Sequence, residues 1–184
     1  MPRTTKPAKQ SSAAPRALFG EQLLLESCDA SRDLYNNGRF GEADAAGRVH
    51  LSLIEACYLL EKGRITVVNS RGKAFSFEQL IRKAKRQPGF WTKYLVFRDM
   101  RNRGYIVKTA LKFGADFRVY DRGVKPGEDH AKWVLFPIHE SQALTWHDFA
   151  AKNRVAHSTK KRLLLAIVDE EAEVTYYEVA WKRP

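Results

Sequence analysis

The stretch KTALKFGADFRVYDRGVKPGEDH, residues 108–130, decides how the second half of the chain folds. Its segment FRVY, residues 117–120, alternates apolar and polar side chains, which is the period of a β-strand. A loop rich in glycine and proline follows, and a new strand is expected at 130–136. The period-two pattern therefore predicts β-strands in this half of the chain.

A second stretch, RVAHSTKKRLLLAIVDEEAEVTYY, covers residues 154–177. Its run LLLAIV lacks alternation, so both faces of that strand should be buried, as in a central strand. The predicted class is α+β, with a mixed-sheet domain flanked by helices. We expect strands at 106–111, 117–120, 130–136, 162–168 and 174–179, and helices at 92–103 and 145–153.

The first half of the chain predicts a small α/β domain with a short antiparallel sheet. The segment ALFGEQLLLE, residues 17–26, is typical of two strands joined by a tight turn at Gly20 and Glu21. A short helix ending near Asn36 and a loop to about Leu51 are expected to follow.

Two capping-box pairs predict helix starts in this half, Ser52 with Glu55 and Ser76 with Gln79. The strand ITVVN, residues 65–69, is expected between these helices. A break at residues 87–89, Gln-Pro-Gly, predicts the domain boundary. The predicted organisation is a leader at 1–16, an N-terminal domain at 17–87 and a C-terminal domain at 88–184.

The chain is strongly basic, with a formal net charge of +11 over 184 residues. Four of its 32 basic residues lie in the leader, which has three prolines and no aromatic or acidic residue and which we expect to be disordered. The remainder still holds more basic than acidic residues. This charge favours phosphate-rich polymers or an anionic membrane as partners.

The sequence gives no sign of a membrane span or a secretion signal. The longest clean apolar run, residues 163–168, has six residues, against roughly 18 needed to cross a bilayer. The basic N-terminus leads into polar residues, so we expect a cytoplasmic protein. Cys28 and Cys57 are too few for a disulfide framework or a zinc site and are typical of small core residues.

Three side chains near strand ends form a candidate catalytic set. Tyr120 ends a strand and points away from Val119, so it can face a groove. His130 follows turn-forming and charged residues and should be accessible, and Lys161 lies at the mouth of the 162–168 strand. Tyrosine, histidine and lysine can supply a base or positioning group, an acid and a positive charge for a pentacoordinate phosphate. Internal attack of this kind needs a 2′-hydroxyl, which only RNA carries.

The two stretches resemble the archaeal tRNA-splicing endonucleases, which cut introns from precursor tRNA at a bulge-helix-bulge fold. The resemblance extends to YLVFRDMRNRGYIVKT at 94–109 and, more loosely, to LSLIEACYLLEKGRI at 51–65. It implies that Tyr120 acts at the 2′-hydroxyl, His130 protonates the departing 5′-oxygen and Lys161 stabilises the phosphate charge. The implied products are a 2′,3′-cyclic phosphate and a 5′-hydroxyl, with no metal or other cofactor. The family often has serine after the histidine, where this chain has Ala131.

The resemblance also implies contacts with RNA and with other subunits. Arg154 would grip a base of the bulge by cation–π contact, and we expect Lys160 and Arg162 to bind flanking phosphates. An acidic loop lies between the last two expected strands, and its residues alone predict a solvated hairpin turn. The resemblance implies that this loop docks into an opposing subunit, that VTYYEVAW at 174–181 forms a dimer seam, and that this chain assembles with itself or a non-catalytic paralogue, as a tetramer. The acidic loop consists of Asp169, Glu170, Glu171 and Glu173.

Two alternatives stay open. In the first, Asp116, Asp121 and Glu128 hold magnesium in a metal-dependent nuclease, which would also cut DNA and would fail in a chelator. In the second, the chain is a non-catalytic RNA-binding subunit of such an assembly, which would require that the three candidate residues lie far apart in space.

Overall fold

The computed structural model describes residues 14–20, 22–124, 127 and 130–182. Residues 1–13 of the leader lie outside this part, as do Glu21, Pro126, Glu128 and Asp129. The chain divides into two compact units, the first ending at Gln79 and the second beginning at Leu80. The boundary predicted at residues 87–89 lies a few residues further on and stays a prediction.

The first unit contains a five-stranded sheet with the order β3-β4-β2-β1-β5. It is antiparallel apart from the parallel pair β1–β5. The predicted strand pair at the start of the chain and the later strand ITVVN are confirmed. The loop predicted up to Leu51 is wrong in one respect, because it contains the short pair β3–β4. The strands are β1 Arg16–Phe19, β2 Leu23–Leu25, β3 Glu42–Ala43, β4 Val49–Leu51 and β5 Thr66–Val68.

The helices of this region are α1 Asp29–Asn36, α2 Leu53–Glu61 and α3 Phe77–Ala84. Both predicted capping boxes are present. The Ser52 hydroxyl accepts from the Glu55 backbone N–H at 3.4 Å, while the Glu55 carboxylate accepts from the Ser52 N–H at 3.0 Å. The Ser76 hydroxyl accepts from the Gln79 N–H at 3.2 Å, and the Gln79 side chain accepts from the Ser76 N–H at 3.1 Å. These reciprocal bonds fix where α2 and α3 begin.

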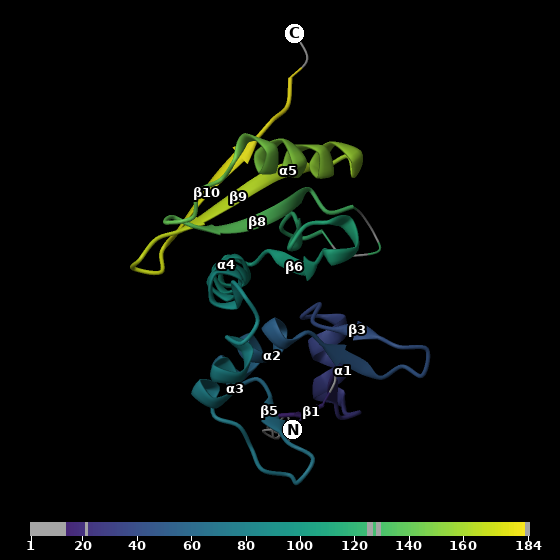
Figure 1. Cartoon of the computed structure of the whole chain (residues 1–184). Coiled ribbons are helices and arrows are strands. Elements are labelled where there is room, and N and C mark those ends of the chain that lie inside the picture. Colours follow the sequence, from purple (N-terminus) through teal and green to yellow (C-terminus); the bar gives the residue numbers. More distant parts are fainter. Residues whose placement is uncertain (1–13, 21, 125–126, 128–129, 183–184) are drawn as a thin grey trace, which may run out of the picture. The chain divides into compact units, whose positions relative to one another are not determined.

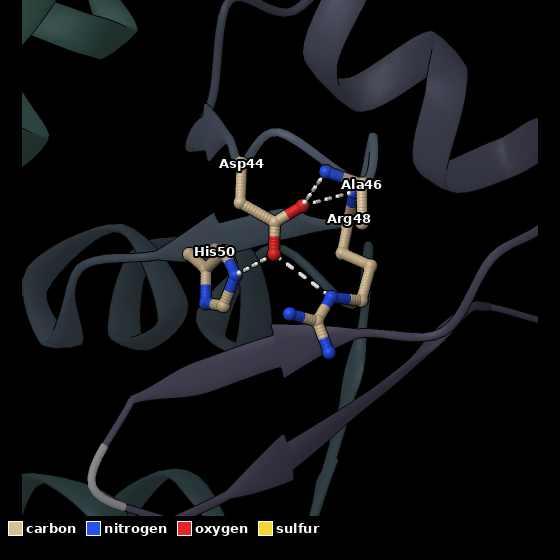
Figure 2. Close-up of polar contacts among 4 residues, drawn as sticks. All are labelled: Asp44, Ala46, Arg48 and His50. Atoms are coloured by element: carbon tan, nitrogen blue, oxygen red, sulfur yellow. Dashed lines mark hydrogen bonds and ion pairs between the residues drawn. The ribbon is translucent and has the colours of Figure 1, made fainter.

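A single aspartate closes the turn between β3 and β4 (Figure 2). One oxygen of Asp44 accepts from the backbone N–H groups of Ala46 and Arg48, both at 2.9 Å. The other oxygen contacts Arg48 Nε at 2.8 Å and His50 Nε2 at 2.9 Å. His50, followed by the Arg48 backbone N–H, holds the pKa of Asp44 well below its usual range. All these partners lie within six residues, so this turn is stabilised locally.

The second unit contains a five-stranded mixed sheet, as predicted, with the order β10-β9-β8-β7-β6. Only the β8–β9 pair is parallel. The strand LLLAIV is an interior strand as expected, although β8 rather than β9 is the middle one. The strands are β6 Ile106–Thr109, β7 Phe117–Tyr120, β8 Trp133–His139, β9 Arg162–Val168 and β10 Val174–Val179.

Helices α4 Phe90–Asn102 and α5 Trp146–Ser158 cover opposite faces of this sheet (Figure 1). On the α4 side the Tyr176 hydroxyl donates to Asp99 at 2.8 Å, and burial raises the pKa of that phenol strongly. On the α5 side Ala156 packs into a core of buried residues from β8 and β9. No helix in the described residues is long and apolar enough to cross a membrane.

Candidate active site

Three strand ends meet at one end of the second sheet. Val119 of β7 pairs with Trp133 of β8, and Trp133 pairs with Arg162 of β9. Tyr120, Lys132 and Lys161 each lie one residue beyond these pairs, at the same end of the sheet. His130 lies two residues before Lys132. The structure thus brings the segments that carry Tyr120, His130 and Lys161 to the same edge, although they are up to 41 residues apart in the sequence.

Tyr120 is more enclosed than a residue facing an open groove would be. Only 5% of its surface is exposed. The Arg118 guanidinium lies 6.0 Å from the centre of the Tyr120 ring. Both side chains belong to the same face of β7, as the predicted alternation required. Arg118 thus limits how the Tyr120 ring can move.

His130 is exposed, as predicted, but it does not begin a strand. Strand β8 starts three residues later, at Trp133. The intervening Ala131 is buried, with 6% of its surface exposed, and the Lys132 N–H donates to Val119 O at 2.9 Å. The chain is therefore anchored directly after His130, whose position is set by the residues that follow it.

Lys161 is held by the C-terminal end of α5. Its N–H donates to Ala156 O at 2.8 Å, and its ammonium donates to Thr159 O at 2.9 Å. Carbonyl groups at a helix C-terminus carry partial negative charge and attract a cation. Lys160 reverses the chain in a left-handed conformation with φ of 53°. The strand itself begins at Arg162, so Lys160 and Lys161 lie before it.

The proposed RNA-binding residues lie in different environments. Lys160 is exposed. Arg162 forms an ion pair with Glu178 at 2.8 Å, and the same carboxylate accepts from Trp133 Nε1 at 2.7 Å. These two partners lower the pKa of Glu178, the Trp133 hydrogen bond most strongly. A phosphate that binds Arg162 would compete with Glu178 for the guanidinium.

Arg154 is exposed and lines a groove of about 770 Å³ between α5 and the chain after β10. Trp181 lines the same groove, with 58% of its surface exposed, and its ring lies 5.0 Å from that of His157. The sequence pattern placed Trp181 only in the segment VTYYEVAW and did not indicate that it lies beside Arg154.

The acidic loop lies at the other end of the sheet, between β9 and β10. The Asp169 N–H donates to Glu173 O at 3.2 Å, and the Asp169 carboxylate accepts from the Glu173 N–H at 2.8 Å. Ala172 has a φ of 65° within this turn. The Glu170 N–H donates to the Glu140 carboxylate at 3.1 Å. The loop is thus an ordered hairpin turn far along the strands from Lys161.

Two of the three carboxylates of the metal-dependent alternative form ion pairs with lysines. Asp116 pairs with Lys93 at 2.7 Å, and Asp121 pairs with Lys132 at 2.6 Å. Asp116 and Asp121 flank β7 at its two ends, and Glu128 lies outside the described residues. The part of the chain that the structure describes contains no group of three or more His, Cys, Asp or Glu side chains suited to a metal ion. Strand β7 thus separates Asp116 from Asp121, so these two carboxylates do not form one metal site.

Two lengths of the chain match one protein family. Residues 14–81 match "tRNA intron endonuclease, N-terminal domain", and residues 90–176 match "tRNA intron endonuclease, catalytic C-terminal domain". The chain is 44% identical to the tRNA-splicing endonuclease of Thermococcus onnurineus over 89% of this chain and 94% of that protein. It is 40% identical to the tRNA-splicing endonuclease of Methanothermobacter thermautotrophicus over 91% of this chain and 96% of that protein. The tRNA-splicing endonuclease of Nanoarchaeum equitans is 43% identical over 79% of this chain and 97% of its own length.

Proposed function

The chain belongs to the tRNA intron endonuclease family, and we propose that it is an endoribonuclease that removes introns from precursor tRNA at bulge-helix-bulge sites. The proposed reaction needs no metal. The 2′-hydroxyl attacks the adjacent phosphate, which leaves a 2′,3′-cyclic phosphate and a 5′-hydroxyl. We expect the reaction to take place in the cytoplasm.

The convergence of three strand ends at one edge of a sheet carries this proposal. Tyr120, Lys132 and Lys161 each lie one residue beyond the cross-strand pairs Val119–Trp133 and Trp133–Arg162, and His130 precedes Lys132 by two residues. In the mechanism, Tyr120 acts at the 2′-hydroxyl and His130 protonates the 5′-oxygen as it leaves. Lys161 stabilises the charge that builds up on the phosphate between them.

The fixed position of Lys161 supports its part in the mechanism. A positive group stabilises a transition state best when it needs no rearrangement during the reaction. The Lys161 N–H and ammonium are both held by carbonyls of the α5 C-terminus. The ammonium has three N–H donors, so the bond to Thr159 O leaves donor capacity for a phosphate oxygen.

Tyr120 can act in two ways, as a base that takes the proton of the 2′-hydroxyl or as a group that orients this hydroxyl. Its small exposure and the Arg118 contact favour a fixed ring in either case. Tyr120→Phe separates them. If Tyr120 is a base, the variant should cleave much more slowly than the parent at every pH. If Tyr120 only orients the hydroxyl, the loss of rate should be smaller.

We propose that the groove beside α5 receives a nucleotide of the bulge. A guanidinium and an indole ring both stack on bases, and single-stranded RNA is commonly held in this way. Arg154 and Trp181 line this groove. Lys160 and Arg162 would contact neighbouring phosphates.

We also propose that the chain acts in an assembly of four subunits, with copies of itself or with a non-catalytic paralogue. Strand β10 is an edge of the sheet, and Tyr177 on it is 56% exposed. An uncovered edge strand can pair with another chain. The acidic loop would supply charge for docking on a basic surface of another subunit.

Cleavage of a bulge-helix-bulge RNA in EDTA tests the proposed reaction. The purified chain should cut this RNA to a cyclic phosphate, and a His130→Ala variant that folds like the parent should not. If the parent is inactive, a candidate partner subunit is added. Cutting that depends on magnesium would contradict the mechanism and favour the metal-dependent alternative.

A further inference from the structure

We propose that the ion pair between Asp121 and Lys132 positions the catalytic residues by tying together the two ends of the loop between β7 and β8. Asp121 directly follows Tyr120, and Lys132 lies two residues after His130. The Asp121 carboxylate and the Lys132 ammonium are 2.6 Å apart. The inference rests on the proposed function, in which Tyr120 and His130 act on one phosphate.

Lys132 forms backbone hydrogen bonds with both β7 and β9. Its N–H donates to Val119 O at 2.9 Å, one residue before Tyr120. Its carbonyl accepts from the Arg162 N–H at 3.0 Å, one residue after Lys161. Its ammonium then adds the side-chain bond to Asp121. Lys132 is thus linked to a chain neighbour of each of the two strand-end residues and is close in sequence to His130.

Asp121 is held from both sides of its carboxylate. One oxygen accepts from the Arg122 backbone N–H at 3.0 Å, and the other accepts from the Lys132 ammonium. The Lys132 hydrogen bond, followed by that of the Arg122 N–H, holds the pKa of Asp121 below its usual range. The carboxylate therefore stays ionised at neutral pH.

Aromatic contacts restrain the same pair from a second direction. The Lys132 ammonium lies 4.4 Å from the centre of the Trp133 ring. That ring meets Tyr105 edge to face at 6.0 Å, and the Arg122 guanidinium lies 4.9 Å from the Tyr105 ring. Arg122 directly follows Asp121, so this series of contacts also connects Lys132 with the segment that carries Asp121. The contacts join residues at the ends of β6, β7 and β8.

An ordinary surface ion pair is the simplest other reading, and the chain supplies a matched control for it. Asp116 and Lys93 are 2.7 Å apart at the opposite end of β7, where Asp116 directly precedes Phe117. The Asp121 and Lys132 side chains are 44% and 38% exposed, and those of Asp116 and Lys93 are 21% and 39% exposed. Exposed pairs contribute little to folding stability. The two lysines are similarly exposed and Asp116 is less exposed than Asp121, but only the Asp121–Lys132 pair lies next to Tyr120 and His130 in the sequence.

The test compares Asp121→Asn, Lys132→Met and Asp116→Asn by single-turnover cleavage of a bulge-helix-bulge RNA in EDTA, together with RNA binding and thermal unfolding. Asp121→Asn should lower the cleavage rate about 10- to 100-fold, since small misplacements of catalytic groups have effects of this size. It should bind RNA at least as tightly as the parent, because it removes a negative charge. Lys132→Met should lower the cleavage rate similarly, Lys132→Arg should restore most of it, and Asp116→Asn should cut like the parent.

Slower cleavage with undiminished RNA binding would separate positioning from a lost phosphate contact. If Asp121→Asn and Lys132→Met cut at the parent's rate, the inference is wrong while the proposed function stands. If Asp116→Asn slows cleavage as much as Asp121→Asn, the effect belongs to β7 in general and the inference is also wrong. A parent that fails to cut, alone or with a partner subunit, would overturn the proposed function and the inference with it.

Discussion

The connections β3–β4 and β7–β8 each contain an aspartate that accepts from the backbone and from a basic side chain, but they do so over different ranges. Asp44 finds all its partners within six residues (Figure 2). Asp121 reaches Lys132, eleven residues away, across the loop that ends near His130. The local network holds one turn, whereas the long-range bond joins two segments that are distant in the sequence. The same interaction thus shapes a turn in the first unit and borders the proposed site in the second.

The largest effect is expected from the β7–β8 connection itself. His130→Ala should lower cleavage by about 10²- to 10⁴-fold, because a positioned general acid contributes factors of this size. The measurement is single-turnover cleavage in EDTA at several pH values. A matched His50→Ala change in β4, which removes a partner of Asp44 in the β3–β4 connection, should leave the cleavage rate within about twofold of the parent. Equal losses in both variants would remove the functional distinction between the two connections.

A loss of about 10²- to 10³-fold is expected for Lys161→Met, because the variant removes a preorganised positive charge. Lys161→Arg should recover part of the rate. Lys112→Met is the matched control. Lys112 is an exposed lysine that follows β6, whose first residue, Ile106, is the one that pairs with Tyr120. A Lys161→Met variant that cuts RNA like the Lys112→Met control would show that the sheet edge at Lys161 plays no chemical part.

A smaller effect, confined to stability, is expected from Asp44→Asn. Because the pKa of Asp44 is lowered by folding, its contribution to stability is present above the ordinary aspartate value of 3.8 and is lost as pH falls through the lower, folded value. The variant should therefore melt at a lower temperature than the parent at pH 6, and the difference should shrink at strongly acidic pH. Thermal unfolding across this range checks the sign. A difference that grows toward acidic pH would contradict the role given to Asp44.

The smallest expected effect concerns the reactivity of Cys57. Burial raises the pKa of the Cys57 thiol to about 12, and the side chain is fully buried, whereas Cys28 is half-buried. Because the thiolate is the reactive form, Cys28 should be alkylated first and Cys57 only when the first unit opens. Asp44→Asn should speed labelling of Cys57, and Asp121→Asn should leave it unchanged. Mass spectrometry of the labelled chain would detect the opposite pattern.

The sequence predicted most of the second sheet but misplaced the ends of β8. Strands β7, β9 and β10 begin and end as expected because their apolar patterns are bounded by clear turn residues. Strand β8 was expected to stop before Pro137, which lacks an N–H. It continues to His139 because β7 pairs with β8 only as far as Leu135, so that beyond this point β8 has a neighbour only on the β9 side.

The short pair β3–β4 escaped prediction because its pattern is too brief. Strand β3 has two residues, both exposed, and carries no apolar alternation. The turn is held by hydrogen bonds of the Asp44 side chain, which a search for periodic apolar residues does not detect. In the site, the sequence motif indicated Tyr120, His130 and Lys161 individually. It could not indicate Lys132, because the role proposed for Lys132 depends on contacts with segments distant in the sequence.

The most direct test of the central claim is cleavage, in EDTA, of two otherwise identical bulge-helix-bulge RNAs, one of which carries 2′-deoxyribose at the cleavage position. Attack by the 2′-hydroxyl requires that the chain, with its partner subunit if one is needed, cut the all-ribose RNA to a 2′,3′-cyclic phosphate and leave the substituted RNA intact. Cutting of the substituted RNA, or cutting only when magnesium is supplied, would contradict it.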